Sequence, residues 1–170
     1  MPSYDESCAE CFVLTFKEGL LSPVAHDLRL VVGRFRIDVE DAGITARFDT
    51  SSLRVDAPMK DGSPLPGALS AADKDKIAAQ IRDEVLHASR YPEARFTSSS
   101  VVLRADGGHD LTGSLTLHGV TRVIHAQTRL LHGRQGLELA LHQPDFGIAP
   151  FKAMLGTLKV QPDVKVLVVV

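Results

Sequence analysis

The chain has 170 residues, of which 44% are hydrophobic and 24% are charged, and its formal net charge is −2 at pH 7. This length and balance predict one domain over residues 1–170 with a sizeable core, and they argue against a nucleic-acid partner. The first residues are acidic and polar, and no apolar run approaches the roughly 20 residues that span a bilayer, so we expect a cytoplasmic protein without stable membrane insertion.

Residues 1–10 are expected to form a loose N-terminal segment, and the first strand is predicted over residues 11–17. Cys8 and Cys11 form a lone C-x-x-C motif and are the only cysteines of the chain. A zinc site would need two further ligands, and a redox dithiol would need a βαβ context that the sequence does not show. We therefore interpret the pair as ordinary thiols in a reducing compartment, and we expect no metal and no cofactor.

A long strand is predicted over residues 27–40. Its apolar side chains occupy even positions in the first half and odd positions in the second half, so the phase changes at Gly33. A glycine at such a change is typical of a β-bulge, which bends a strand and helps a sheet to close. Alternating segments over residues 44–48 and 53–55 predict the strands that follow.

A helix is predicted in the middle of the chain, after a loop over residues 57–67 that contains three prolines and two glycines. The helix is expected to begin after Ser70, whose side chain can cap free amides, and to end by Arg90, because Pro92 disfavours helical geometry in the residue before it. Its apolar side chains recur every four residues, at Ile77, Ile81 and Val85. This spacing predicts one apolar stripe on an amphipathic helix.

From residue 95 onward the chain is predicted to form strands joined by tight turns. In residues 109–118 the leucines alternate with polar side chains, which is typical of a sheet with one apolar and one polar face. His118 and His125 fall on the polar phase and are expected at the solvent-exposed surface. We count eight strands or slightly more, so we predict an all-β fold: an antiparallel eight-stranded barrel with one amphipathic helix inserted midway. Such a barrel has room for packed side chains or for one small ligand.

Several segments, in this order, resemble the YceI-like family: Arg82-Asp83 with Val85-Leu86, Arg90–Ser98 (RYPEARFTS), Leu111–Thr121 (LTGSLTLHGVT) and Asp145–Ile148 (DFGI). The resemblance runs from about Phe12 to the C-terminus. It implies a lipocalin-like antiparallel barrel that carries a long amphiphile, such as a polyisoprenoid or fatty-acyl compound, in its lumen. A homodimer is also compatible with the resemblance.

The predicted binding residues are in-phase apolar side chains, because a hydrocarbon tail needs a dry and continuous wall. They are Leu14, Leu30, Val32, Phe35, Phe48, Phe96, Leu115, Leu117, Phe146, Phe151, Met154 and Leu155. The same residues would also serve simply to fill a core. His26, at a strand entrance, is a candidate for contact with a polar head, since histidine titrates near physiological pH.

We therefore predict non-enzymatic binding or sequestration of a long-chain amphiphile. The alternatives are a small isomerase or hydrolase that uses His26 as acid or base, and a fully packed barrel that acts as an interaction module. The sequence contains no nucleophile elbow, zinc-protease motif, phosphate loop or dinucleotide fingerprint.

Overall fold

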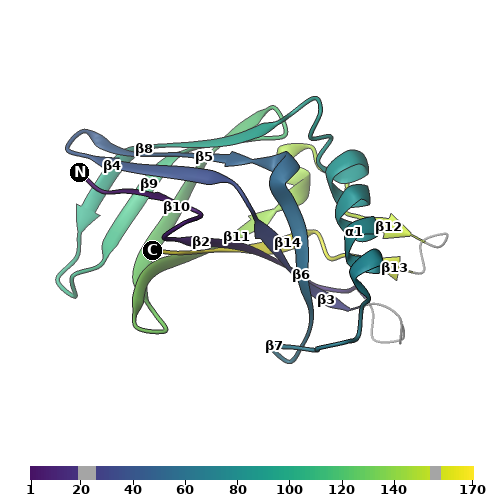
Figure 1. Cartoon of the computed structure of the whole chain (residues 1–170). Coiled ribbons are helices and arrows are strands. Elements are labelled where there is room, and N and C mark those ends of the chain that lie inside the picture. The colour runs from purple at the N-terminus through teal and green to yellow at the C-terminus, as the bar shows by residue number, and fades with distance from the viewer. Residues whose placement is uncertain (19–25, 154–157) are drawn as a thin grey trace.

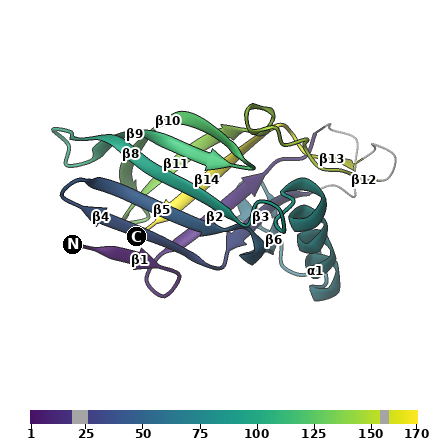
Figure 2. The ribbon, with the colours of Figure 1, turned by 90° about the horizontal axis from the view of Figure 1, so that it is seen from above.

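The computed structural model describes residues 1–18, 26–153 and 158–170. It is dominated by one antiparallel sheet of twelve strands, in the order β1-β4-β5-β8-β9-β10-β11-β14-β2-β3-β6-β7. In chain order these strands are β1 (Ser3–Asp5), β2 (Glu10–Thr15), β3 (Asp27–Val32), β4 (Phe35–Glu40), β5 (Gly43–Asp49), β6 (Leu53–Lys60), β7 (Ser63–Pro64), β8 (Glu93–Leu103), β9 (His109–Leu117), β10 (Val120–Leu131), β11 (Arg134–His142) and β14 (Asp163–Val169). The sheet curls strongly over its length (Figures 1 and 2).

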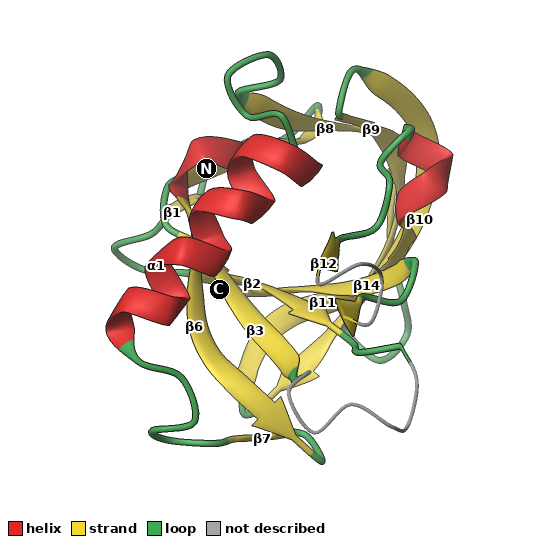
Figure 3. Ribbon diagram, turned by 90° about the vertical axis from the view of Figure 1, so that its right-hand side faces the viewer, coloured by secondary structure: helices red, strands yellow, loops and turns green. Residues whose placement is uncertain are grey.

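The remaining elements lie mainly at one end of the curled sheet (Figure 1). Helix α1 (Ala71–Gln80) continues into a π-helical turn, η2 (Ile81–Val85), while η1 (Thr50–Ser52) and η3 (Gln143–Phe146) are short 3₁₀ turns. A two-stranded ribbon pairs β12 (Lys152–Ala153) with β13 (Leu158–Lys159). Viewed from this end, α1 lies in front of part of the sheet and β12 lies to its right (Figure 3). No helix among the described residues is long and apolar enough to cross a membrane.

The predicted all-β class and the single substantial helix midway are confirmed, but the closed barrel of eight strands is wrong. The sheet has twelve strands and runs from an edge at β1 to an edge at β7, so it forms a curled half-barrel. Both edge strands are only two or three residues long. Two or three residues are too few to show an alternating pattern. Strands of this length are recognised only by the strand with which they pair.

The expected bulge at Gly33 is instead a break between β3 and β4, which pair with different neighbours. Neighbouring atoms leave no room for a side chain at position 33, which explains why a glycine stands there. A β-carbon at position 33 would lie 2.5 Å from Nη1 of Arg54 and 3.0 Å from the carbonyl oxygen of Ser52. The sheet irregularity in this region lies between Arg29 and Leu30 of β3. The phase change in the sequence therefore marks a change of strand partners.

The predicted loop over residues 57–67 is also only partly correct, because its first half belongs to β6 and its centre to β7. Pro58 and Pro64 are tolerated close to the sheet edge, where a missing amide removes no bond from a central ladder. The helix begins as predicted. Ser70 accepts a hydrogen bond from the backbone amide of Asp73 at 3.1 Å. The helical turns end at Val85, slightly earlier than expected.

Candidate ligand-binding cavity

A cavity of about 410 Å³ lies on the concave side of the curled sheet. Its size falls within the range of about 300–1,000 Å³ that is typical of small-molecule sites. Most of its lining is aliphatic or aromatic. Alternate residues of four adjacent strands supply much of that wall: Leu137, Leu139 and Leu141 of β11, Val164, Val166 and Val168 of β14, Cys11, Val13 and Thr15 of β2, and Leu28, Leu30 and Val32 of β3. The period of two along each strand therefore builds one continuous apolar surface.

The helix covers part of this surface with its apolar stripe. Ile77, Ile81 and Val85 line the cavity from α1 and η2, as does Leu86 just after them. From the opposite side, Phe146 of η3 and the following Ile148 reach the cavity, and both are buried. The cavity is therefore bounded by sheet, helix and turn together.

Most of the residues predicted to bind a ligand lie on this lining, namely Leu30, Val32, Phe48, Phe96, Leu115, Leu117, Phe146, Phe151 and His26. Their role as ligand contacts remains a prediction. Leu14 does not line the cavity, because alternation along β2 turns Val13 inward and Leu14 to the other face. Phe35 is buried behind the lining and stacks on Phe48, with ring centroids 5.9 Å apart. Met154 and Leu155 lie outside the described residues.

Polar side chains gather at the end of the cavity near β13. Thr15, Lys17, His26, Gln143 and Lys159 all line it. Sequence reasoning singled out only His26 among them. Thr15 and Lys17 gave no clear signal, because both faces of the predicted strand over residues 11–17 carry apolar side chains, while Gln143 and Lys159 fall in a turn and in a very short strand.

The backbone at this end is held by a chain of hydrogen bonds. Gln143 Nε2 donates to the carbonyl oxygen of Gln161 at 3.1 Å, and Gln161 Nε2 donates to the carbonyl oxygen of Lys17 at 3.0 Å. The amide of Lys17 donates to Oδ1 of Asp27 at 2.8 Å. Both the backbone amide and the carbonyl oxygen of Lys17 are therefore held by side chains.

His118 is not the solvent-exposed surface histidine that alternation predicts. It is half-buried, and its ring packs against Tyr91, with centroids 4.5 Å apart. Its Nδ1 lies 3.3 Å from the carbonyl oxygen of Phe146. Alternation fails here because His118 and Gly119 form the tight β9–β10 turn, with φ of 54° and 74°. The turn thereby holds η3, which places Phe146 against the cavity.

Burial lowers the pKa of His118, although its hydrogen bond to Phe146 partly opposes this shift, and the nearby basic side chains of His87 and Arg90 lower the pKa further. A carbonyl oxygen only accepts hydrogen bonds, so Nδ1 carries the proton. Its Nε2 is buried without a partner among the described residues. The neutral ring is therefore the form that this environment favours.

The two cysteines have different surroundings, which argues against a redox pair. Cys11 is buried and lines the cavity, and burial raises the pKa of its thiol to about 12. Cys8 is exposed in the turn after β1, and the two thiols are free. A thiol with so high a pKa is a poor nucleophile at neutral pH.

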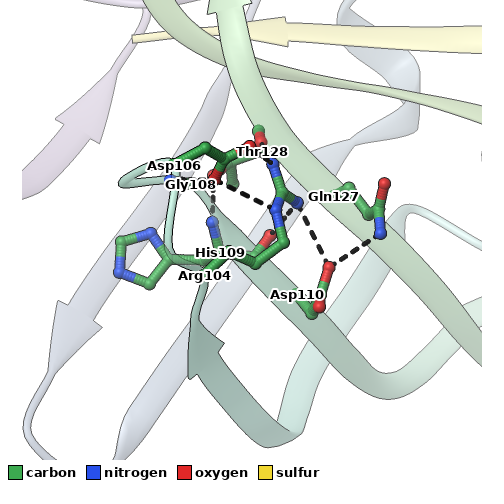
Figure 4. A network of polar contacts seen from close by, with 7 residues as sticks. All are labelled: Arg104, Asp106, Gly108, His109, Asp110, Gln127 and Thr128. Carbon is green, nitrogen blue, oxygen red and sulfur yellow. Dashed lines mark hydrogen bonds and ion pairs between the residues drawn. The ribbon is translucent and has the colours of Figure 1, made fainter.

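A polar network at the β8–β9 turn lies away from the cavity lining (Figure 4). Arg104 donates to Asp106, to Asp110 and to the carbonyl oxygen of Thr128, the last at 2.9 Å. Hydrogen bonds from Arg104 lower the pKa of Asp106. The network ties the turn to β10, so we assign it a structural role.

Comparison with known proteins identifies the fold. The YceI-like domain pattern matches residues 11–170. A UPF0312 protein of Pseudomonas putida is 42% identical over 53 residues, and one of Vibrio parahaemolyticus is 46% identical over 54 residues. Each match spans 31% of this chain and 27% of the relative's own length.

Solved structures resemble the whole chain. BcnA of Burkholderia cenocepacia aligns with a TM-score of 0.65 at 15% identity, over 97% of this chain and 96% of that one. A polyisoprenoid-binding domain from Saccharophagus degradans, implicated in plant cell wall breakdown, aligns with a TM-score of 0.64 at 17% identity, over 98% and 94% of the two chains. These likenesses show the fold alone. Because the domain pattern covers nearly the entire sequence, this chain belongs to the YceI-like family.

Proposed function

We propose that this protein binds a long-chain amphiphile, of polyisoprenoid or fatty-acyl type, in the cavity and catalyses no reaction on it. The observation that carries the proposal is the apolar hollow of about 410 Å³ enclosed by sheet, helix and turn. A fully packed barrel acting as an interaction module is disfavoured by the same hollow. The similarity to a domain that is itself named for polyisoprenoid binding supports the ligand class.

Hydrophobic burial is large enough to support this binding only when the tail is long. Each methylene removed from water contributes about 0.8 kcal/mol, so ten contribute on the order of 8 kcal/mol. Association and ordering of the chain oppose binding by about 4 to 15 kcal/mol. Short tails are therefore expected to bind poorly and long tails well.

Organic extraction of the purified protein followed by mass spectrometry tests the proposal. We expect a long-chain compound in near-stoichiometric amount. Ala46→Phe places a ring in the hollow, because Ala46 is buried and lines the cavity, so it is expected to reduce the recovered compound. Ala140→Phe is the matched control, since Ala140 is exposed on β11 between two inward-facing leucines. An empty protein that also fails to take up any long-chain compound added in vitro would contradict the proposal.

The enzymatic alternative rests on His26, which does line the cavity. It requires turnover of a bound compound that is lost in His26→Ala while the variant stays folded. Recovery of chemically unchanged compound after incubation with the wild-type protein supports binding without catalysis.

A further inference from the structure

The polar end of the cavity carries an unusual number of ammonium groups. Lys17 and Lys159 both line the cavity, beside His26. Their segments are neighbours in space although they are far apart in sequence: Lys17 forms an isolated β-bridge with Val160, and the amide of Glu18 donates to the carbonyl oxygen of Lys159 at 2.9 Å. Two lysines therefore line the cavity from neighbouring segments, Lys17 on the face that it shares with Val160 and Lys159 from the adjacent position of β13.

A third lysine lies next to this pair. In the β12–β13 ribbon Lys152 is directly opposite Lys159, and both are exposed. Directly opposed residues of two antiparallel strands share one face, and like charges in such positions destabilise the pairing. Among residues 1–18, 26–153 and 158–170, no carboxylate lies within ion-pair distance of any of the three ammonium groups. An anion bound here would relieve their mutual repulsion.

Thr15 supplies an independent indication of a polar ligand. It is two residues before Lys17 on the same face of the chain and also lines the cavity. The residue is only 8% exposed, and its hydroxyl has no hydrogen-bond partner within the part of the chain that the structure describes. A buried hydroxyl without a partner is unfavourable, and it can donate to an oxygen atom that enters the cavity.

The acidic residues nearby do not neutralise this end. Asp27 directs Oδ1 at the backbone amide of Lys17, at 2.8 Å. Glu18 is exposed to solvent. The positive side chains are therefore available to a ligand, while the rest of the lining is mostly apolar, with Asp49, Thr50 and Gln80 as its polar members.

We infer that this end of the cavity recognises a terminal oxyanion, a carboxylate or a phosphate, on the bound amphiphile. Lys17 and Lys159 provide the charge, with Lys152 beside them, and Thr15 donates a hydrogen bond below them. Charge-assisted hydrogen bonds to oxyanions are the strong members of their class. The inference rests on the proposed function, because it orients the amphiphile with its tail inward and its head at the lysines.

Binding of four probes with the same sixteen-carbon tail tests the inference: hexadecanoate, hexadecyl phosphate, hexadecan-1-ol and hexadecylamine. Affinities are measured below the critical micelle concentrations, by displacement of the neutral dye Nile red. We expect both anions to bind at least about tenfold more tightly than the alcohol and the amine to bind most weakly, as one added charged contact predicts. The difference is expected to shrink as salt is added.

Substitutions of the two lysines test whether they cause the preference for anionic probes. Lys17→Gln combined with Lys159→Gln is expected to remove most of the advantage of the anions over the alcohol. Lys165→Gln is the matched control, because Lys165 lies on the outer face of β14 and pairs with Glu138 at 3.2 Å. An anion preference that survives the double variant would overturn the assignment.

The outcomes separate this inference from the proposed function. Binding of all four probes with equal affinity would overturn the oxyanion site and leave amphiphile binding intact. Failure of every probe to bind would overturn the proposed function itself. Displacement of hexadecanoate by millimolar inorganic phosphate alone would show a free-phosphate site and overturn recognition of a head group coupled to a tail.

Discussion

The ring of Phe96 occupies the space beside the backbone of Gly113. A β-carbon at position 113 would lie 2.6 Å from two ring carbons of Phe96 and 2.4 Å from the carbonyl oxygen of Thr97. Since Phe96 lines the cavity, the absent side chain on β9 helps to set the shape of the hollow. Gly113→Ala is expected to lower the free energy of unfolding by about 1 to 3 kcal/mol, measured by urea denaturation. Ser114→Ala, at an exposed neighbour, is expected to change it little, and equal stability of both variants would contradict the packing argument.

Affinity is expected to depend on tail length until the cavity is filled. In a series of primary alcohols each added methylene should tighten binding about fourfold, because it contributes about 0.8 kcal/mol. The gain should then cease at a limiting length, and Ala46→Phe should move that limit to shorter tails. Nile red displacement measures both effects. A flat response across the series would count against burial of the tail.

Thr15→Val is expected to stabilise the ligand-free protein by about 1 kcal/mol, because it removes a buried hydroxyl that has no partner among the residues that the structure describes. Thr50→Val provides the contrast. Thr50 also lines the cavity, but its hydroxyl donates to the carbonyl oxygen of Tyr91 at 2.7 Å, so its loss should destabilise by about the same amount. Urea midpoints of the two variants should therefore move in opposite directions; a shift in the same direction would show that the Thr15 hydroxyl is satisfied.

The stability of the protein is expected to fall in mild acid through His118. Burial holds the pKa of His118 below its ordinary value of 6.5, so the unfolded chain binds this proton more readily than the folded protein does. The stabilising contribution is therefore complete above pH 6.5 and declines as the pH falls below it. Urea denaturation from about pH 7.5 to about pH 5 should show a weaker pH dependence in His118→Gln than in the wild type. Identical slopes would argue against this contribution.

The two thiols are expected to react at very different rates. Cys8 is exposed, whereas Cys11 is buried and its pKa is raised to about 12. A thiol-specific disulfide reagent should therefore modify one cysteine in the native protein and both in urea. Cys8→Ser is expected to abolish the fast native reaction. Persistent fast labelling of that variant would show that Cys11 is accessible.

The sequence predicts best the strands that have one apolar and one polar face. Over residues 109–117 the alternation is unambiguous, and Leu111, Leu115 and Leu117 all line the cavity. In β2 both faces are apolar, so the phase cannot be read. Phe12 and Leu14 fall on the outer face, where the guanidinium of Arg29 lies 5.2 Å from the ring centroid of Phe12. A cation that covers an aromatic ring allows the ring to lie on the outer face of a sheet. The alternation of apolar and polar residues then no longer shows which face is outward.

The cationic end of the cavity could not be found from the sequence. Lys17 and Lys159 come from opposite ends of the chain and meet only because β14 returns beside β2. The strands β12 and β13 have two residues each, so their pairing is set by tertiary contacts and not by local propensity. The family resemblance indicated the antiparallel β class but not the half-barrel, and these lysines come together only in the folded chain.

The position of β14 has a consequence for how the molecule assembles. It is the last strand in sequence order, yet it lies between β11 and β2 and joins the seven strands on one side of the sheet to the four on the other. While the chain is being synthesised, the two groups can form separately, but among the described strands no hydrogen-bonded ladder connects them until β14 has left the ribosome. The hollow is therefore completed last, and its apolar wall stays divided through most of translation.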